Sequence, residues 1–277
     1  MEILQSIVLG IIQGLSEFFP ISSSGHLVLI PFFFRWDYST ILFTVTVHLG
    51  TLVALLTVYF KDVLSIIKFF LLGLFRPAYR KEGQFKTAVF IIVASIPAVI
   101  VGFFIESKIE SILSSPLIAA SALLFTALVL FIGEKVGNKL ENTKGKPKNF
   151  NYIIALVVGF GQAIAIIPGI SRSGTTISFS RIFGIKREES VRFSFLLSIP
   201  IILGSFLFEL VKSFGEIKIG GLQTIVSLIA GFIFSYIAGI FAIKFMLRIT
   251  RNKNLNFFAI YCVLLSITVF IFYFLRN

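Results

Sequence analysis

The sequence predicts an all-α integral membrane protein built as an inverted-topology repeat, in which each half is a re-entrant broken-helix hairpin followed by three transmembrane helices. Three observations predict this fold class. Hydrophobic residues fill 57% of the 277 positions, six apolar runs are long enough to cross a bilayer, and two further apolar regions are each broken by a Ser/Gly-rich motif. A chain this apolar lacks the polar surface that a soluble domain needs.

The six apolar runs predict full transmembrane spans. A helix needs about 20 apolar residues to cross roughly 30 Å of hydrocarbon, and lipid offers no partners for backbone polar groups. The runs show no alternation with a period of two, so we expect helices rather than barrel strands. The expected spans are 41–60, 87–105, 116–133, 193–211, 223–243 and 256–275.

The two broken regions predict re-entrant hairpins. Residues 3–20 lead into Pro20-Ile-Ser-Ser-Ser-Gly-His26, and residues 151–168 lead into Pro168-Gly-Ile-Ser-Arg-Ser-Gly-Thr-Thr176. Pro and Gly beside hydroxyl residues end a helix. Because non-helical backbone at membrane depth survives only inside protein or beside a cavity, each region should enter and leave on the same side.

The two broken regions also resemble each other, which favours an internal duplication. Aligned at an offset of 149, seven of 18 positions are identical: Val8, Gly10, Gln13, Ile21, Ser22, Ser24 and Gly25 match Val157, Gly159, Gln162, Ile170, Ser171, Ser173 and Gly174. The alternative is that Gly and Ser simply recur in membrane helices. We expect one membrane domain, 1–277, with halves 1–133 and 151–277 and a linker, 134–150. Three spans are an odd number, so the second half should be inverted.

Charge placement predicts the orientation. The loops 61–86, 134–150, 181–192 and 244–253 fall on one side and hold 19 of the 25 lysines and arginines, whereas five fall on the other side. By the positive-inside rule, the basic side is cytoplasmic and both termini lie outside. The net charge of +12 is therefore a topology signal, and we expect no nucleic-acid partner. The single cysteine, Cys262, excludes a disulfide framework within the chain.

Ionisable residues inside the apolar regions are the candidate functional residues, because burial in a membrane is costly. Gln13 and Glu17 are four residues apart and share one helix face, where two oxygen atoms could bind a divalent cation, Mg²⁺ or Ca²⁺. Alternatively, Glu17 pairs with Arg172 and neutralises it.

The two Ser/Gly motifs predict anion sites. Backbone N–H groups and hydroxyls at a helix start bind phosphate, and Ser22, Ser23, Ser24 and Gly25 form one such turn. The second turn comprises Ser171, Arg172, Ser173 and Gly174. It adds a guanidinium group whose planar fork suits phosphate oxygens. If the two turns face one another, they make a diphosphate pocket.

Two histidines need separate interpretations. His26 follows Ser23 by three residues, so both could face one cavity, where His26 could act as a general acid or base or prepare Ser23 for attack. The alternative is a capping or packing histidine. For His48, inside an expected span, we favour a hydrogen-bonded structural role.

At these motifs the chain resembles bacterial undecaprenyl-diphosphatases, also called bacitracin-resistance proteins. The segment Gln13–His26 resembles the family's (Glu/Gln)-x-x-x-Glu region, and Pro168–Thr176 resembles its Pro-Gly-x-Ser-Arg-Ser-x-x-Thr signature. The resemblance covers nearly the whole chain. It implies removal of one phosphate from the lipid undecaprenyl diphosphate, dependence on a divalent cation, and a multi-pass protein of the bacterial inner membrane whose active site opens to the outer face.

The resemblance also implies roles for particular residues. Glu17 would serve metal binding or acid–base catalysis with Gln13 beside it, His26 and Ser23 would form a catalytic pair, and Arg172 would clamp the diphosphate. The implied polar lining comprises Ser22, Ser24, Gly25, Ser171, Ser173, Gly174 and Thr176. Many relatives have Glu where this chain has Gln13, and an amide oxygen is a weaker cation ligand.

Several alternatives stay open at this point. Attack could come from Ser23, through a phosphoserine, or from a cation-bound water. Inverted repeats with broken helices are also transporter features, so a lipid-phosphate or anion transporter or flippase is the competing function. The sequence does not decide whether the chain forms a homodimer.

Overall fold

The chain begins with two helices that are each too short to cross a bilayer. The computed structural model describes residues 2–37, 40–113, 115–142, 149–212, 221–251 and 253–276, without the side chains of 105–113, 142 and 209–212. Helix α1 (Ile3–Phe18) has 16 residues and is about 24 Å long. Helix α2 (Ser23–Phe34) follows it and begins at the first serine motif, where the Ser22 hydroxyl accepts the Gly25 N–H.

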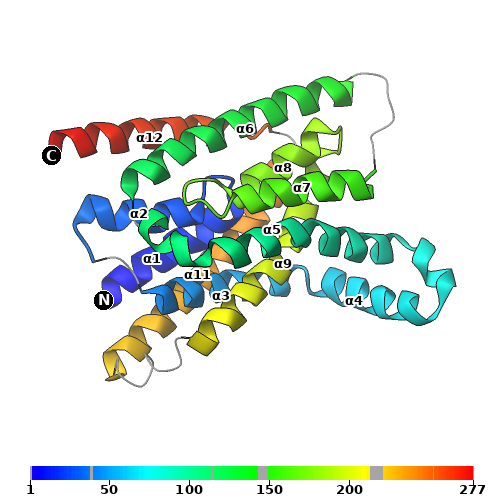
Figure 1. Ribbon diagram of the computed structural model, residues 1–277, viewed down its shortest axis with the longest axis horizontal. Helices are drawn as coiled ribbons and strands as arrows, with labels where there is room; N and C mark the ends of the chain where they lie inside the picture. The colour runs from blue at the N-terminus through cyan, green and yellow to red at the C-terminus, as the bar shows by residue number, and fades with distance from the viewer. Residues whose placement is uncertain are drawn as a thin grey trace.

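The second broken region forms a matching pair of short helices, α7 (Tyr152–Ile164) and α8 (Arg172–Ile182). Ser171 caps α8 as Ser22 caps α2, with its hydroxyl accepting the Gly174 N–H. In Figure 1, α1 and α2 occupy the left part of the molecule, α7 and α8 the right part, and the two connecting loops meet near the middle. The predicted helix breaks are therefore confirmed.

Six longer helices are apolar enough to cross a membrane, as predicted. They are α3 (Ile41–Val58), α5 (Gly83–Leu113), α6 (Pro116–Asn142), α9 (Arg187–Lys212), α11 (Gly221–Ile249) and α12 (Asn256–Arg276). The described residues contain no β-strand. Large apolar side chains such as Phe103, which is 76% exposed, cover the outer surface, as expected for a protein that faces lipid rather than water. The chain is an all-α, multi-pass membrane protein.

Two segments differ from the expected loops. Residues 61–86 are not a simple loop, because α4 (Phe60–Phe75) and the 3₁₀ helix η1 (Pro77–Lys81) occupy most of it. Exposed apolar residues follow a helical spacing along α4, and they are Phe60, Leu64, Ile67, Leu71 and Leu74. Residues 134–142 of the predicted linker continue α6, and 143–148 lie outside the described residues.

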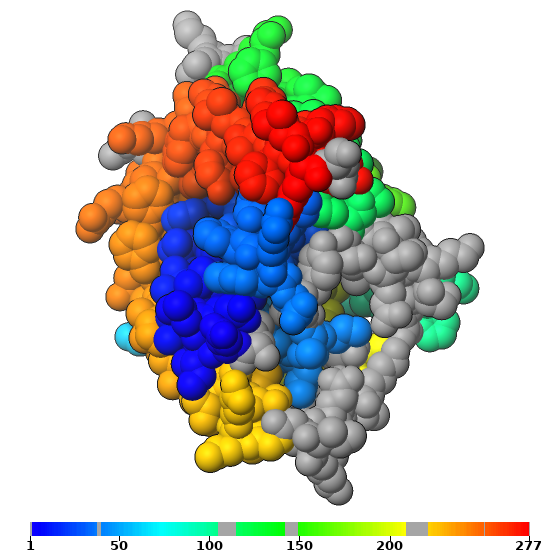
Figure 2. Space-filling model, turned by 90° about the vertical axis from the view of Figure 1, so that its left-hand side faces the viewer, coloured from blue at the N-terminus to red at the C-terminus, as the bar shows by residue number. Residues whose placement is uncertain are grey.

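Glycines bring α1 and α11 into close backbone contact. A Cβ atom on Gly10 would lie 2.6 Å from the carbonyl oxygen of Gly231, and one on Gly14 would lie 2.5 Å from that of Ser235. Small residues at membrane-helix interfaces permit such approach. Figure 2 views the end of the molecule that carries the termini, with α1 and α2 in blue, α12 in red above them and α11 in orange beside them. These neighbours fix the position of the first hairpin.

A buried ion network joins α6 to the end of α8 and the start of α9. Arg181 is fully buried, pairs with Glu141, and donates to the Asn138 amide oxygen over 2.8 Å. Arg187 binds both carboxylate oxygens of Glu134, at 3.0 and 2.7 Å. In Figure 1, α6 ends and α7 begins at the right-hand end, away from both termini. The network therefore lies at the end of the molecule to which the basic loops belong.

Candidate active site

The two serine loops contact each other directly. The Ser22 hydroxyl accepts the Gly169 N–H at 3.1 Å and donates to the Ile170 carbonyl at 3.4 Å, while the Ser173 hydroxyl donates to the Phe19 carbonyl at 3.2 Å. Ser22 has a positive φ of 69°, a strained conformation for a residue with a side chain. Contacts across the two loops hold it there, so each loop helps to shape the other.

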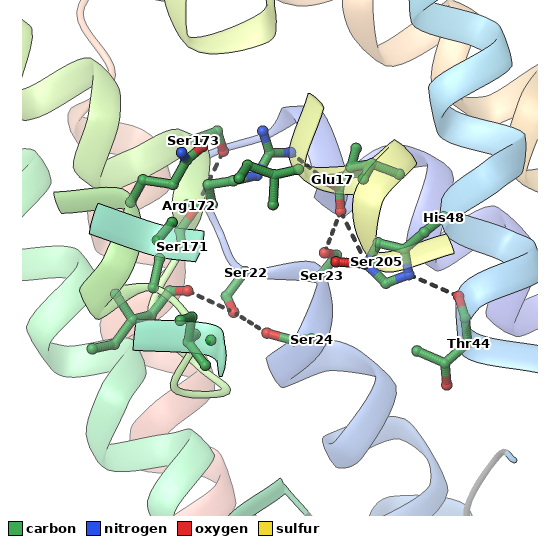
Figure 3. A pocket seen from close by; sticks show the side chains of 18 of the residues that line it. Glu17, Ser22, Ser23, Ser24, Thr44, His48, Ser171, Arg172, Ser173 and Ser205 are labelled. Atoms are coloured by element: carbon green, nitrogen blue, oxygen red, sulfur yellow. Dashed lines mark hydrogen bonds and ion pairs between the residues drawn. The ribbon is translucent and has the colours of Figure 1, made fainter. Parts of the chain in front are cut away.

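Glu17, at the end of α1, is the centre of the polar cluster. It forms an ion pair with Arg172, the first residue of α8, although 155 residues separate them. Its Oε2 atom accepts the Ser23 hydroxyl at 2.6 Å and the Gln13 amide at 2.9 Å. The Nε2 atom of His48 lies 3.6 Å from the same oxygen. Figure 3 shows Glu17 between Arg172 on one side and Ser23 and His48 on the other.

These groups line one cavity of about 420 Å³, within the range of about 300–1,000 Å³ for small-molecule sites. Its polar lining includes most of the residues predicted from the two motifs: Glu17, Ser22, Ser23, Ser24, Ser171, Arg172 and Ser173. Its apolar lining comes from α3, α5 and α9 and from the loop between α7 and α8. The cavity therefore offers polar groups for a charged headgroup and apolar side chains for a hydrocarbon.

Three predicted lining residues lie behind the cavity wall instead. The N–H groups of Gly25 and Gly174 are used by the helix caps, at 3.2 and 3.0 Å. The Thr176 hydroxyl binds the Ser194 hydroxyl at 2.7 Å. None of the three is among the described residues that line the cavity. Hydroxyls and the guanidinium, rather than these backbone N–H groups, remain available to an anion.

The expectation that His26 faces the same cavity as Ser23 is wrong, because Ser23 lines the cavity and His26 does not. Its Nδ1 atom donates to the Ser22 carbonyl at 2.7 Å, and its Nε2 atom bonds the Tyr261 hydroxyl at 2.7 Å. The His26 and Tyr261 rings are also stacked. Both ring nitrogens are thus occupied: Nδ1 bonds the start of α2 itself, and Nε2 joins α2 to α12.

Gln13 is close to Glu17, as predicted, but it presents its amide nitrogen and not its oxygen. The buried Gln13 Oε1 has no hydrogen-bond partner among the described residues. No group of three or more His, Cys, Asp and Glu side chains that could hold a metal occurs in the described part of the chain. A divalent cation here would have Glu17 as its single carboxylate ligand from the protein. Mg²⁺ commonly binds through one or two carboxylates plus substrate phosphates, so this donor set fits a cation that shares its ligands with a diphosphate.

Sequence reasoning assigned His48 a structural role, yet it lines the cavity. Its Nδ1 atom donates to the Thr44 carbonyl at 2.7 Å, which is a structural hydrogen bond, while Nε2 faces Glu17. The signal was available, because His48 is ionisable inside an apolar run. Gln162 and Ser205 also line the cavity. Ser205 had no distinguishing sequence signal, whereas Gln162 aligns with Gln13 when the two broken regions are compared at an offset of 149.

Comparison with known proteins gives one consistent result. The family model for the bacitracin resistance protein BacA matches residues 6–268. An undecaprenyl-diphosphatase of Moorella thermoacetica is 38% identical over 100% of both chains. An undecaprenyl-diphosphatase of Thermodesulfovibrio yellowstonii is 40% identical, over 100% of this chain and 99% of its own. One of Halothermothrix orenii is 41% identical, over 98% of both chains.

Proposed function

Because the chain belongs to the bacitracin resistance protein BacA family, we propose that it hydrolyses undecaprenyl diphosphate to undecaprenyl phosphate and inorganic phosphate. The observation that carries the proposal is the cluster of Glu17, Ser23 and Arg172 in one cavity between two serine loops. The product is the lipid carrier for cell-wall synthesis, and its recovery underlies resistance to bacitracin. A lipid carrier protein would need no hydroxyl held against a carboxylate, so this cluster favours the enzyme over the transporter.

Ser23 is the proposed nucleophile. Its hydroxyl already donates to Glu17 Oε2 at 2.6 Å, within the range expected for a general base and its proton. Glu17 takes the hydroxyl proton as Ser23 Oγ bonds to the terminal phosphorus. The bond from that phosphorus to the bridging oxygen breaks, and undecaprenyl phosphate leaves. Water then attacks the phosphoserine, and inorganic phosphate is released while Ser23 regains a proton.

Arg172 stabilises the charge that develops on the phosphate groups. Phosphoryl transfer depends mainly on positioning and on electrostatic stabilisation, and a guanidinium binds two phosphate oxygens at once. In the substrate-free protein Arg172 pairs with Glu17. The incoming diphosphate replaces that carboxylate as the partner of Arg172, which frees Glu17 to accept the proton of Ser23.

A divalent cation, Mg²⁺ or Ca²⁺, is part of the proposed site. Glu17 would hold it, with the amide oxygen of Gln13 and the diphosphate as the other oxygen donors. When bound, it would neutralise charge on the diphosphate. The Gln13 Oε1 atom has no hydrogen-bond partner among the described residues, and rotation of the side-chain amide, whose nitrogen now bonds Glu17, would turn this oxygen toward the carboxylate; both points support the assignment.

We propose the inverted repeat as the architecture that creates this pocket, with the pocket open to the outer face. Equivalent serines cap α2 and α8, and an added Cβ on the equivalent glycines Gly10 and Gly159 would meet carbonyl oxygens at 2.6 and 2.5 Å. The cavity-lining parts of α3, α5 and α9 lie toward the end with both termini. The ion network of Arg181 and Arg187 lies at the opposite, basic end and ties α6, α8 and α9 together there.

Phosphate release from undecaprenyl diphosphate in detergent micelles tests the function. We expect release by the wild-type protein and a loss of at least about 10²-fold in Arg172→Ala and Glu17→Ala, in line with the loss of one electrostatic or acid–base group. Equal release by all three proteins would exclude this catalytic site. No release by the wild type, with lipid transfer between vesicle leaflets instead, would favour the transporter.

A further inference from the structure

We propose that the apolar part of the cavity, here called the tail arm, binds the first isoprene units of the substrate, and that Gly102 sets the preference for a prenyl tail. The inference rests on the proposed function. The tail arm is lined by Val45 of α3, Ala98 and Gly102 of α5, and Ile201, Ile202 and Phe206 of α9.

The tail arm and the polar cluster belong to the same cavity. Glu17, Ser23 and Arg172 and the residues of the tail arm line the same space of about 420 Å³. This volume is near the lower end for sites that enclose whole small ligands. It therefore holds the diphosphate and only the nearest part of a long tail, and the rest of the tail must lie in the surrounding lipid.

Gly102 leaves space in the wall of the tail arm. An added Cβ there would meet only the Cδ1 atom of Ile166, at 4.0 Å. In contrast, a Cβ on Gly14 or Gly159 would meet backbone oxygen at 2.5 Å. Those two glycines serve helix packing, whereas the space at Gly102 has a single neighbour, at the outer limit of ordinary contact distance, among the described residues. A substrate methyl group fits such a space.

Gly102 also lies where the cavity approaches the lipid-facing surface. Val99 and Phe103 on either side of it in α5 are 60% and 76% exposed. Since Gly102 has no side chain, it is the thinnest part of the α5 wall. The tail leaves the tail arm past Gly102 and continues along the apolar outer face of α5.

The test compares Gly102→Leu with a matched control, Gly204→Leu. Gly204 is also inside a long helix, a Cβ added there meets nothing within 4 Å, and it does not line the cavity. For each protein, kcat/KM is measured for undecaprenyl diphosphate and for methyl diphosphate, which has the same phosphoanhydride but no tail. In a hydrophobic site a change of one methylene alters selectivity by about 10–200-fold. We therefore expect the ratio of the two kcat/KM values to fall at least about tenfold in Gly102→Leu and to change less than about twofold in Gly204→Leu.

The outcomes separate this inference from the proposed function. Wild-type protein that releases no phosphate from either diphosphate contradicts the function itself. If the wild type is active but Gly102→Leu leaves the ratio of the two kcat/KM values unchanged, the inference about the tail arm is overturned and the proposed function is not. An equal loss of kcat/KM on both substrates leaves the ratio unchanged and has the same consequence. If Gly102→Leu does not fold, Gly102→Ala should shift the ratio in the same direction by a smaller factor, and an unchanged ratio there overturns the inference.

Photocrosslinking gives a measurement that does not depend on turnover. A diazirine on the second isoprene unit of undecaprenyl diphosphate should label peptides that contain Gly102 or Ile201–Phe206 in the wild-type protein. Labelling confined to other helices would overturn the inference.

Discussion

Removing the charge of Glu17 should separate the stability of the cluster from its chemistry. The Glu17 and Arg172 side chains are 5% and 17% exposed, and Glu17→Gln leaves the guanidinium without its carboxylate. Loss of one partner from a buried pair costs about 3–5 kcal/mol. Because Arg172 retains some exposure to the cavity, we expect about 3 kcal/mol. At roughly 2–4 °C per kcal/mol for chains of about 150–250 residues, the unfolding midpoint in detergent should fall by about 6–12 °C.

The double variant Glu17→Gln/Arg172→Gln provides the decisive comparison. Neutralising both partners leaves no uncompensated buried charge, which is the source of the destabilisation in the single variant, so its midpoint should lie above that of Glu17→Gln. Phosphate release should nevertheless stay at least about 10²-fold below wild type in both variants, because both lack the base and the double variant also lacks the phosphate clamp. A double variant no more stable than Glu17→Gln would refute the assignment of the pair as a mutually compensating buried contact.

Three further predictions follow from the same geometry. Ser23→Ala should lower phosphate release by about 10³-fold or more and abolish the phosphoserine that rapid quench traps in the wild type. The control Ser95→Ala, outside the cavity lining, should do neither. Wild-type turnover without any phosphoprotein would favour a water nucleophile. Gly10→Ala should destabilise the protein by about 1–3 kcal/mol, since its Cβ would lie 2.6 Å from the Gly231 carbonyl oxygen. The control Gly204→Ala should not destabilise it. Equal thermal midpoints for the two variants would contradict the close α1–α11 packing. Chelation with EDTA should stop phosphate release, and Mg²⁺ or Ca²⁺ should restore it. The thermal unfolding midpoint without substrate should stay the same, because the protein supplies only one carboxylate to the cation. Undiminished release in EDTA would exclude the cation.

The serine motifs were predictable as helix starts because capping is a local property. The Ser22 hydroxyl binds an N–H group three residues ahead, and Ser171 does the same in the second motif. The chain itself encodes this geometry. The pairing of Glu17 with Arg172 was one of two interpretations in the sequence, and the structure contains it. Whether a cation also binds there stays a prediction.

Helix α4 was missed because basic residues obscured its pattern. Lys61 and Lys68 interrupt the apolar run, so the segment reads as a cytoplasmic loop under the positive-inside rule. In the structure its apolar residues share one exposed stripe, from Phe60 to Leu74. Hydrophobicity averaged along the chain does not detect such a stripe, whereas the periodicity of a single helix does.

The sequence by itself determined the membrane class, the six spans and the two helix breaks, because these depend on hydrophobicity and local backbone chemistry. Only the tertiary structure decided which histidine faces the cavity. His26 is turned to Tyr261, 235 residues away, whereas His48 is turned to Glu17 of a different helix. The rotation of a half-helix about its axis depends on contacts with distant helices, such as Gly10 against Gly231, and such contacts leave no signal in local spacing.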